Sequence, residues 1–194
     1  DNDLNSQLSL DNSGNVYMAG VYTSSELNIY DFTNENVPIG NLYNDISGSK
    51  AVFITKYNEA GVNQWKTKIT GYDVMSEPSI YTSKNGDTFV AMQNYDLSDN
   101  DVSGIYIYDV NNVSEPVKTL QGEIYNIPNT ILVKYTTDGV FDWNCRVKLL
   151  HYPVLDTSGS SGTVVTGDLS GNVYVTGFYP SYDLSGGIEI YDTS

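Results

Sequence analysis

The segment DNSGNVYMAG at residues 11–20 decides the fold, because it returns near the end of the chain as DLSGNVYVTG at residues 168–177. A looser version, TSKNGDTFVA, occupies residues 82–91. Each version places Gly beside Asn or Asp, ahead of a run of β-branched and aromatic residues. Gly and Asn adopt positive φ at little cost, so each segment predicts a tight turn that leads into a strand.

A second block repeats at a spacing of 78 residues. The segment FITKYNEAGVNQW at residues 53–65 matches ILVKYTTDGVFDW at residues 131–143. The tryptophans that end the two segments, Trp65 and Trp143, lie 78 positions apart, as do the lysines and glycines inside them. Coinciding offsets indicate tandem repeats of one structural unit.

A third block, ending in Ile-Tyr-Asp, occurs three times, at residues 27–31, 105–109 and 188–192. In the two complete units it lies inside a long insertion between the second and third predicted strands. The tyrosine and aspartate therefore recur at one position of the unit.

The patterns predict strands throughout, and no segment carries a capped helical stripe. Each complete unit is expected to hold four strands, and the third unit two. The predicted strands are 6–11, 15–22, 51–58 and 62–69, then 76–83, 87–95, 130–136 and 140–149, then 162–168 and 172–179. Four-stranded antiparallel blades in tandem favour an all-β fold, a β-propeller of about two and a half blades in an incomplete ring. A β-sandwich is the alternative, although it requires no repeat.

We divide the chain into three parts on this basis. Blade 1 is expected over residues 1–70 with an insertion near 23–50, blade 2 over 71–150 with an insertion near 96–129, and the first half of blade 3 over 151–194. Two and a half blades cannot close a ring, and a second copy brings the same half blade. We therefore expect the remainder of a larger propeller, or other protein chains, to cover the open apolar faces.

Composition excludes several classes of function. The chain carries 9 Lys plus Arg against 24 Asp plus Glu, a formal net charge of -15. Such a surface repels phosphate backbones and anionic lipid, so no nucleic-acid partner is expected. No apolar run reaches the ~20 residues that span a bilayer. One cysteine, Cys145, and one histidine, His151, provide neither an internal disulfide nor a Cys/His zinc site.

These segments resemble the SBBP family of β-propeller repeats, which typically read as D-s-x-G-N-v-Y-v-t-G, then a-F-v-x-K, then a-G-x-x-x-W. The resemblance covers residues 6–69 and 77–149 as complete units and 161–194 as half a unit, with a looser turn in the second. Long units of this kind look similar to repeats in predicted proteins of large DNA viruses and in bacterial surface proteins. The resemblance implies a non-catalytic scaffold located on an extracellular surface or a virion.

The recurring Tyr-Asp pairs are candidate binding residues. One interpretation is a ring of aromatic–carboxylate pairs that binds sugars or a partner protein; the other is packing of the inserted strand against the blade. Repeated residues of repeat proteins are usually structural, which favours packing, as for Trp65 and Trp143. The six candidates are Tyr30, Asp31, Tyr108, Asp109, Tyr191 and Asp192.

A calcium loop is a second candidate. Asp96, Asp99, Asp101 and Ser103 supply oxygen ligands with the spacing that opens such a loop. The twelfth position from Asp99 is Val110, where the loop needs a bidentate Glu. A solvated acidic turn is the favoured interpretation, and no other cofactor is expected.

The sequence therefore favours a non-catalytic structural and interaction module that mediates protein–protein assembly or attachment. Its insertions are interpreted as displayed loops, whose removal should leave folding largely intact. The alternatives are a carbohydrate-binding propeller lectin and a fragment of a propeller glycoside hydrolase or lyase. A Cys145–His151 nucleophile–base pair is disfavoured, because neither residue recurs in the other units.

Overall fold

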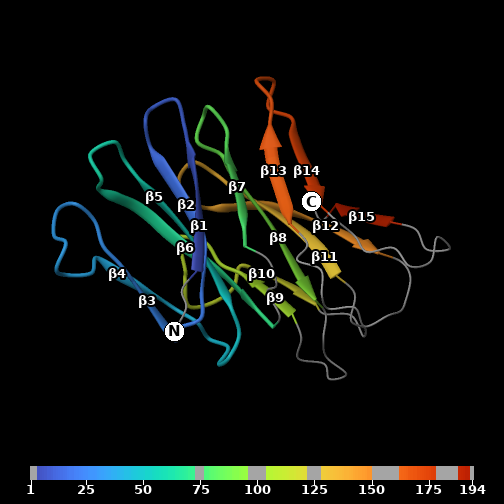
Figure 1. Cartoon of the computed structure of the whole chain (residues 1–194), viewed down its shortest axis with the longest axis horizontal. Helices are drawn as coiled ribbons and strands as arrows, with labels where there is room; N and C mark the ends of the chain where they lie inside the picture. The colour runs from blue at the N-terminus through green and yellow to red at the C-terminus, as the bar shows by residue number, and fades with distance from the viewer. Residues whose placement is uncertain are drawn as a thin grey trace.

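The computed structural model describes residues 4–72, 77–95, 104–121, 128–149, 162–177 and 188–192. For residues 188–192 the description is limited to the backbone. These ranges hold fifteen strands and no helix (Figure 1). The all-β class is thus confirmed for the described part of the chain, in which no helix could cross a membrane.

Every complete predicted unit contributes four antiparallel strands that pair in chain order. In the first unit they are β1 (Leu4–Leu10), β2 (Val16–Tyr22), β5 (Ala51–Tyr57) and β6 (Asn63–Gly71). In the second unit they are β7 (Ser79–Thr82), β8 (Thr88–Tyr95), β11 (Pro128–Tyr135) and β12 (Phe141–Leu149). The third unit contributes the hairpin of β13 (Thr163–Gly167) and β14 (Val173–Gly177). All ten strands lie close to their predicted positions.

The insertions also form strands. The first insertion folds into a hairpin of β3 (Glu26–Ile29) and β4 (Gly40–Tyr43), and the second into a hairpin of β9 (Gly104–Ile107) and β10 (Lys118–Gln121). β15 (Ile188–Asp192) holds the Ile-Tyr-Asp block of the third unit. These five strands were not among the predicted core strands.

The sheets differ from the predicted four-stranded blades. The first sheet has six strands in the order β1-β2-β5-β6-β9-β10, and the second has five in the order β15-β12-β11-β8-β7. The extra strands come from the insertion of the following unit, which pairs with the outer strand of the unit before it. Its alternating β-branched residues suit a strand at a sheet edge, so the insertion continues the neighbouring sheet.

The tight turns explain why the DxSGNVY segment recurs. The Asp168 carboxylate accepts hydrogen bonds from the backbone N–H groups of Ser170 and Asn172, the Asn172 side chain and the Tyr174 hydroxyl. These hydrogen bonds, led by that of the Asn172 amide, lower the pKa of Asp168 to about 2. The glycine of the turn, Gly171, has a φ of 89°, which L side chains rarely adopt. Asp11 makes the same set of contacts in the first unit.

The second unit keeps the turn with different residues. Ser83 stands where the other units have Asp, and its hydroxyl accepts the Asp87 N–H at 3.1 Å. Phe89 stands where they have Tyr and lacks the hydroxyl that would donate to the carboxylate. The acceptor and its donor are therefore replaced together within one chain.

The second sheet is buried on both of its faces. One face packs against the first sheet in a shared core that includes Tyr17 and Ile54 on one side and Val90 and Ile131 on the other. The opposite face packs against Val165 of the third unit, through a cluster that includes Phe89. Figure 1 shows the three units in succession, with the β1–β2, β7–β8 and β13–β14 turns along one side of the molecule. Burial on both faces is what stacked blades require.

Candidate functional site

The second insertion hairpin brings two units together at one place. β9 pairs with β6, with Ile69 opposite Ile107 and Thr70 opposite Tyr106. Tyr108 continues the ladder, because its N–H donates to the Lys68 carbonyl at 3.2 Å. The Ile-Tyr-Asp block of the second unit is thus fixed on the outer strand of the first.

Lys68 is the charged residue at the centre of this junction. Its side chain is 1% exposed, and its Nζ lies 2.6 Å from the Tyr43 carbonyl oxygen and 2.5 Å from Asp45 Oδ2. The ammonium also lies 4.4 Å from the centroid of the Tyr108 ring. A buried lysine needs this set of partners, since an unpaired ammonium is costly to remove from water. We call Asp45, Lys68 and Tyr108, with the hydrogen bonds between them, the Lys68 junction.

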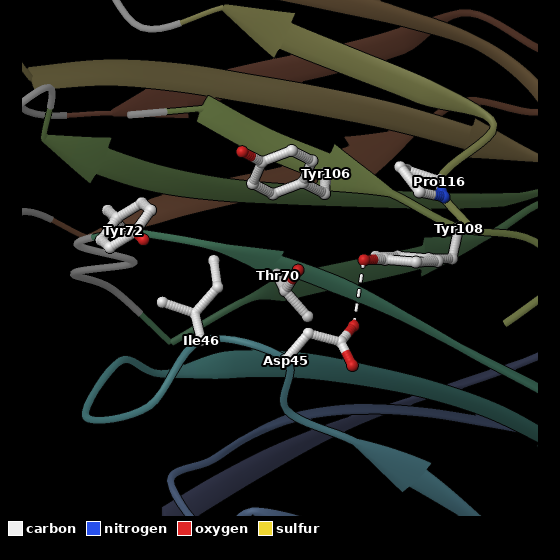
Figure 2. A pocket seen from close by; sticks show the side chains of 7 residues that line it. All are labelled: Asp45, Ile46, Thr70, Tyr72, Tyr106, Tyr108 and Pro116. Atoms are coloured by element: carbon white, nitrogen blue, oxygen red, sulfur yellow. Dashed lines mark hydrogen bonds between the residues drawn. The ribbon is translucent and has the colours of Figure 1, made fainter. Parts of the chain in front are cut away.

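Tyr108 joins the junction through its hydroxyl as well as its ring. The hydroxyl donates to Asp45 Oδ2 at 3.1 Å (Figure 2). Burial, together with the nearby Asp45 carboxylate, raises the pKa of Tyr108 to about 12. The phenol therefore stays neutral and acts as a hydrogen-bond donor over the whole physiological pH range.

An open groove of about 320 Å³ lies beside the junction. Figure 2 shows Tyr106 and Pro116 on one side, Asp45 and Ile46 on the other, and Thr70 between them. Its lining residues are Asp45, Ile46, Thr70, Tyr72, Tyr106, Tyr108 and Pro116. Aromatic faces with one carboxylate acceptor suit the binding of a flat or ring-shaped ligand. Acid–base catalysis by a carboxyl pair would need a second acid, and Asp45 is the one acid in this lining.

The aspartates of the recurring pairs hold their own turns. Asp109 accepts the N–H groups of Asn111 at 2.9 Å and Phe141 at 3.3 Å. Asp31 accepts those of Thr33 at 2.9 Å and Asn63 at 3.4 Å. The acceptors and their distant donors are each 78 residues apart, so this contact repeats with the unit. Each aspartate ties its insertion to the outer hairpin of the same unit.

The structure therefore brings together only part of the predicted set. Tyr108 lines the groove, whereas Tyr30 is 41% exposed on the edge of the first insertion hairpin. Tyr191 and Asp192 lie in β15, where the description stops at the backbone. The calcium candidates Asp96, Asp99, Asp101 and Ser103 lie outside the described residues, as does His151. Within the described ranges no cluster of three His, Cys, Asp or Glu side chains could hold a metal.

The tryptophans join units, as their repetition predicted. The Trp65 indole N–H donates to the Thr137 carbonyl of the second unit at 3.0 Å, and Lys56 Nζ donates to the same oxygen. Trp143 packs with Phe89 near the third unit. Neither ring forms part of the groove.

Sequence reasoning missed Lys68, Asp45 and the tyrosines Tyr72 and Tyr106. One signal was available, because Lys68 and Arg146 lie 78 residues apart in a chain that has only 9 basic residues. Arg146 donates to the Gln121 carbonyl at 3.0 Å, the counterpart of the bond from Lys68 to Tyr43. A basic residue at this position is therefore a repeated part of the unit.

Comparison with known proteins gives one distant relative. An uncharacterised WD repeat-containing protein of Acanthamoeba polyphaga mimivirus is 26% identical over 194 residues, covering 92% of this chain but only 13% of that protein. No protein-family model matches the chain, and no solved structure matches it. The similarity favours a repeat protein of the propeller type, and the resemblance to SBBP repeats stays a prediction.

Proposed function

We propose that this chain is a non-catalytic structural and interaction module of the propeller type, part of a larger protein on an extracellular or virion surface. The observation that carries the proposal is the use made of the repeated residues. Lys68, Trp65 and Tyr108 each contact a neighbouring unit. They build a continuous body from successive repeats, as a scaffold for other proteins requires. The WD-repeat name of the viral relative supports the same class.

The insertions serve this scaffold in a different way from the one predicted. Ile105, Ile107 and Leu120 of the second insertion hairpin belong to the core shared by the first two units. Removing this hairpin would expose that core and the edge of β6. The expectation that every insertion can be trimmed without loss of folding is therefore wrong for the β9–β10 hairpin.

Zero-length carbodiimide cross-linking of the native protein in its own assembly tests the interaction role. The formal charge of -15 offers many carboxylates for coupling to lysines of a protein partner. We expect mass spectrometry to find links from exposed acids such as Glu35 and Glu115 to other polypeptides or other domains. Links confined to this chain would contradict the proposal.

A carbohydrate-binding role is the second candidate, because the groove combines tyrosine rings with the Asp45 carboxylate. A glycan array probed with the full chain and with a Tyr72→Ala/Tyr106→Ala double variant distinguishes the two roles. Exposed Phe32 provides a matched control as Phe32→Ala, since its ring lies outside the groove lining. Glycan binding that the double variant alone abolishes would replace the scaffold proposal with a lectin. The scaffold proposal expects no such binding.

A further inference from the structure

The first and second units bury their equivalent faces very differently. In the second unit, the face turned toward the first unit includes Ile80, 7% exposed, and Thr82, 5% exposed. Counting back from the turn glycines Gly14 and Gly86, their counterparts in the first unit are Leu8 and Leu10. Each of these leucines is 63% exposed. We call this face of the first unit its rear face.

More of the rear face shows the same contrast. Leu8 lies opposite Met18 and Leu10 opposite Val16 across the β1–β2 ladder, so all four side chains share this face. Met18 and Phe53 are partly exposed, whereas their counterparts Val90 and Ile131 are fully buried in the core between the first two units. Leucine, methionine and phenylalanine side chains in one exposed patch indicate a surface that another body covers.

The first insertion hairpin has an unused edge beside this face. β9 pairs with β6, and β15 pairs with β12, in each case the outer strand of the preceding unit. The register is the same: Ile107 lies opposite Ile69, and Ile190 opposite Val147, the residue 78 positions after Ile69. β3 is the third strand of this kind, and within the described ranges it pairs only with β4.

The direction of the backbone groups shows which amides are available on β3. The Ile29 carbonyl accepts the Ile39 N–H across the hairpin, as the Ile107 carbonyl accepts that of Val117. Alternate residues of a strand point their peptide groups to opposite edges. The next N–H, that of Tyr30, therefore points away from β4, as the Tyr108 N–H points to Lys68.

The two pairings seen in the structure also fix the chemistry of the partner. Lys68 contacts Tyr108, and Arg146 lies opposite Tyr191 at the same register position. Both outer strands thus present a basic residue to the tyrosine of the Ile-Tyr-Asp block. Tyr30 is 41% exposed where Tyr108 is 4% exposed. A cationic side chain over the Tyr30 ring would complete the third copy of this contact.

We propose that the rear face and the free edge of β3 form one docking surface for a preceding repeat unit of the same polypeptide. The outer strand of that unit pairs antiparallel with β3 and places Lys or Arg against Tyr30. Both outer strands of the described chain, β6 and β12, are already paired, so a second copy has none to offer there. The viral relative, of which this chain covers 13%, has the length for further repeats. The inference rests on the proposed scaffold function and specifies how it is extended.

A fusion protein tests the proposal directly. Residues 77–159 are placed ahead of residue 1 of the full chain, so that the added unit supplies an outer strand with Arg146. Hydrogen exchange then reports on the amides of Asn28 and Tyr30. We expect their exchange to slow by about 100-fold relative to the chain alone, toward the rate of Tyr108. Arg146→Gln in the added unit alone should reverse part of this protection, and Arg146→Lys should keep it.

Two outcomes would overturn the proposal. One is a fusion whose added β8 and β11 amides are protected while those of Asn28 and Tyr30 exchange as fast as in the chain alone. The other is protection of β3 in the chain alone that rises with concentration as the mass doubles, which would assign the surface to a second copy. Glycan binding in the groove would contradict the scaffold function without changing either exchange result.

A second measurement holds if the added unit does not fold. In the full chain, Leu8→Gln/Leu10→Gln should leave the melting temperature unchanged and reduce binding of a hydrophobic dye, because the rear face is solvent-exposed. Ile80→Gln, at the buried counterpart, is the matched variant and should lower the melting temperature. A loss of stability in the leucine variant as large as that of Ile80→Gln would also overturn the proposal.

Discussion

The two insertion hairpins, β3–β4 and β9–β10, have the same design and different surroundings. Both close through an isolated bridge, Asp31 with Asn34 and Asp109 with Asn112. Both attach to the outer hairpin of their own unit through one backbone bond, from Phe32 to Gly61 or from Val110 to Gly139. The difference between them lies at the other edge, where β9 meets β6 and β3 meets no described strand.

This difference separates what a unit builds alone from what its neighbour adds. The turn, the aspartate contacts and the hairpin register are local, so both hairpins have them. Burial of the tyrosine and its contact with a basic residue need the preceding unit, so only Tyr108 among the described side chains has them. Equivalent substitutions in the two hairpins should therefore have equal effects at local positions and unequal effects at the tyrosine.

The largest inequality is expected between Tyr108→Ala and Tyr30→Ala. Removing the buried Tyr108 ring leaves a cavity beside Lys68, and should lower the free energy of unfolding by about 3–5 kcal/mol. Removing the exposed Tyr30 ring should lower it by about 1 kcal/mol or less. Urea denaturation of the full chain measures both. Equal losses would show that the preceding unit contributes nothing to the second hairpin.

The next effect concerns the charge balance of the Lys68 junction. Asp45→Ala leaves the buried Lys68 ammonium with the Tyr43 carbonyl and the Tyr108 ring as its remaining contacts. Because Asp45 itself is nearly half exposed, we expect a loss of about 2–3 kcal/mol rather than the larger value of a fully buried pair. Urea denaturation measures the loss in the full chain.

Glu35→Ala is the control for this variant, because Glu35 is an exposed acid in the turn of the first insertion. It removes the same charge from the surface without touching Lys68. A similar loss in both variants would mean that overall charge, rather than the junction, determines the result.

The sequence predicted the ten core strands well because the information for them is local. Turn glycines such as Gly14 and Gly86 have positive φ, and the β-branched runs that follow them begin β2 and β8. The five insertion strands were missed because β3 and β9 are only four residues long, and their pairing depends on a strand of another unit. The same reason explains the two sheets of six and five strands in place of four.

The candidate site was predicted only in part. The repeated Tyr-Asp pairs were found, yet the aspartates hold turns and Tyr108 is the one member that lines the groove. Asp45 and Tyr72 have no repeated neighbours in the alignment of the units, so periodicity could not single them out. They meet Tyr108 only because the second insertion crosses to the first sheet.

A smaller and more equal effect is expected for the two aspartates. Asp31→Ala and Asp109→Ala each remove an acceptor for two backbone N–H groups, one in the turn and one in the outer hairpin. Since both contacts lie within one unit, we expect both variants to lower the melting temperature by a similar amount. Differential scanning calorimetry compares them. A large drop for Asp109→Ala alone would mean that the aspartate, like the tyrosine, depends on the neighbouring unit.

The smallest effect appears at alkaline pH and isolates the Tyr108 hydroxyl. Its pKa rises from 10.0 to about 12 on folding, because burial and the Asp45 carboxylate disfavour the phenolate. A raised folded-state pKa gives a stabilising contribution that is complete below pH 10 and is lost as the pH rises through 12. The difference in unfolding free energy between the wild type and Tyr108→Phe should therefore narrow between pH 10 and 12. Tyr30→Phe is the matched control, and a difference that stays constant over this interval for Tyr108→Phe would show that its phenol titrates alike in the folded and unfolded chain.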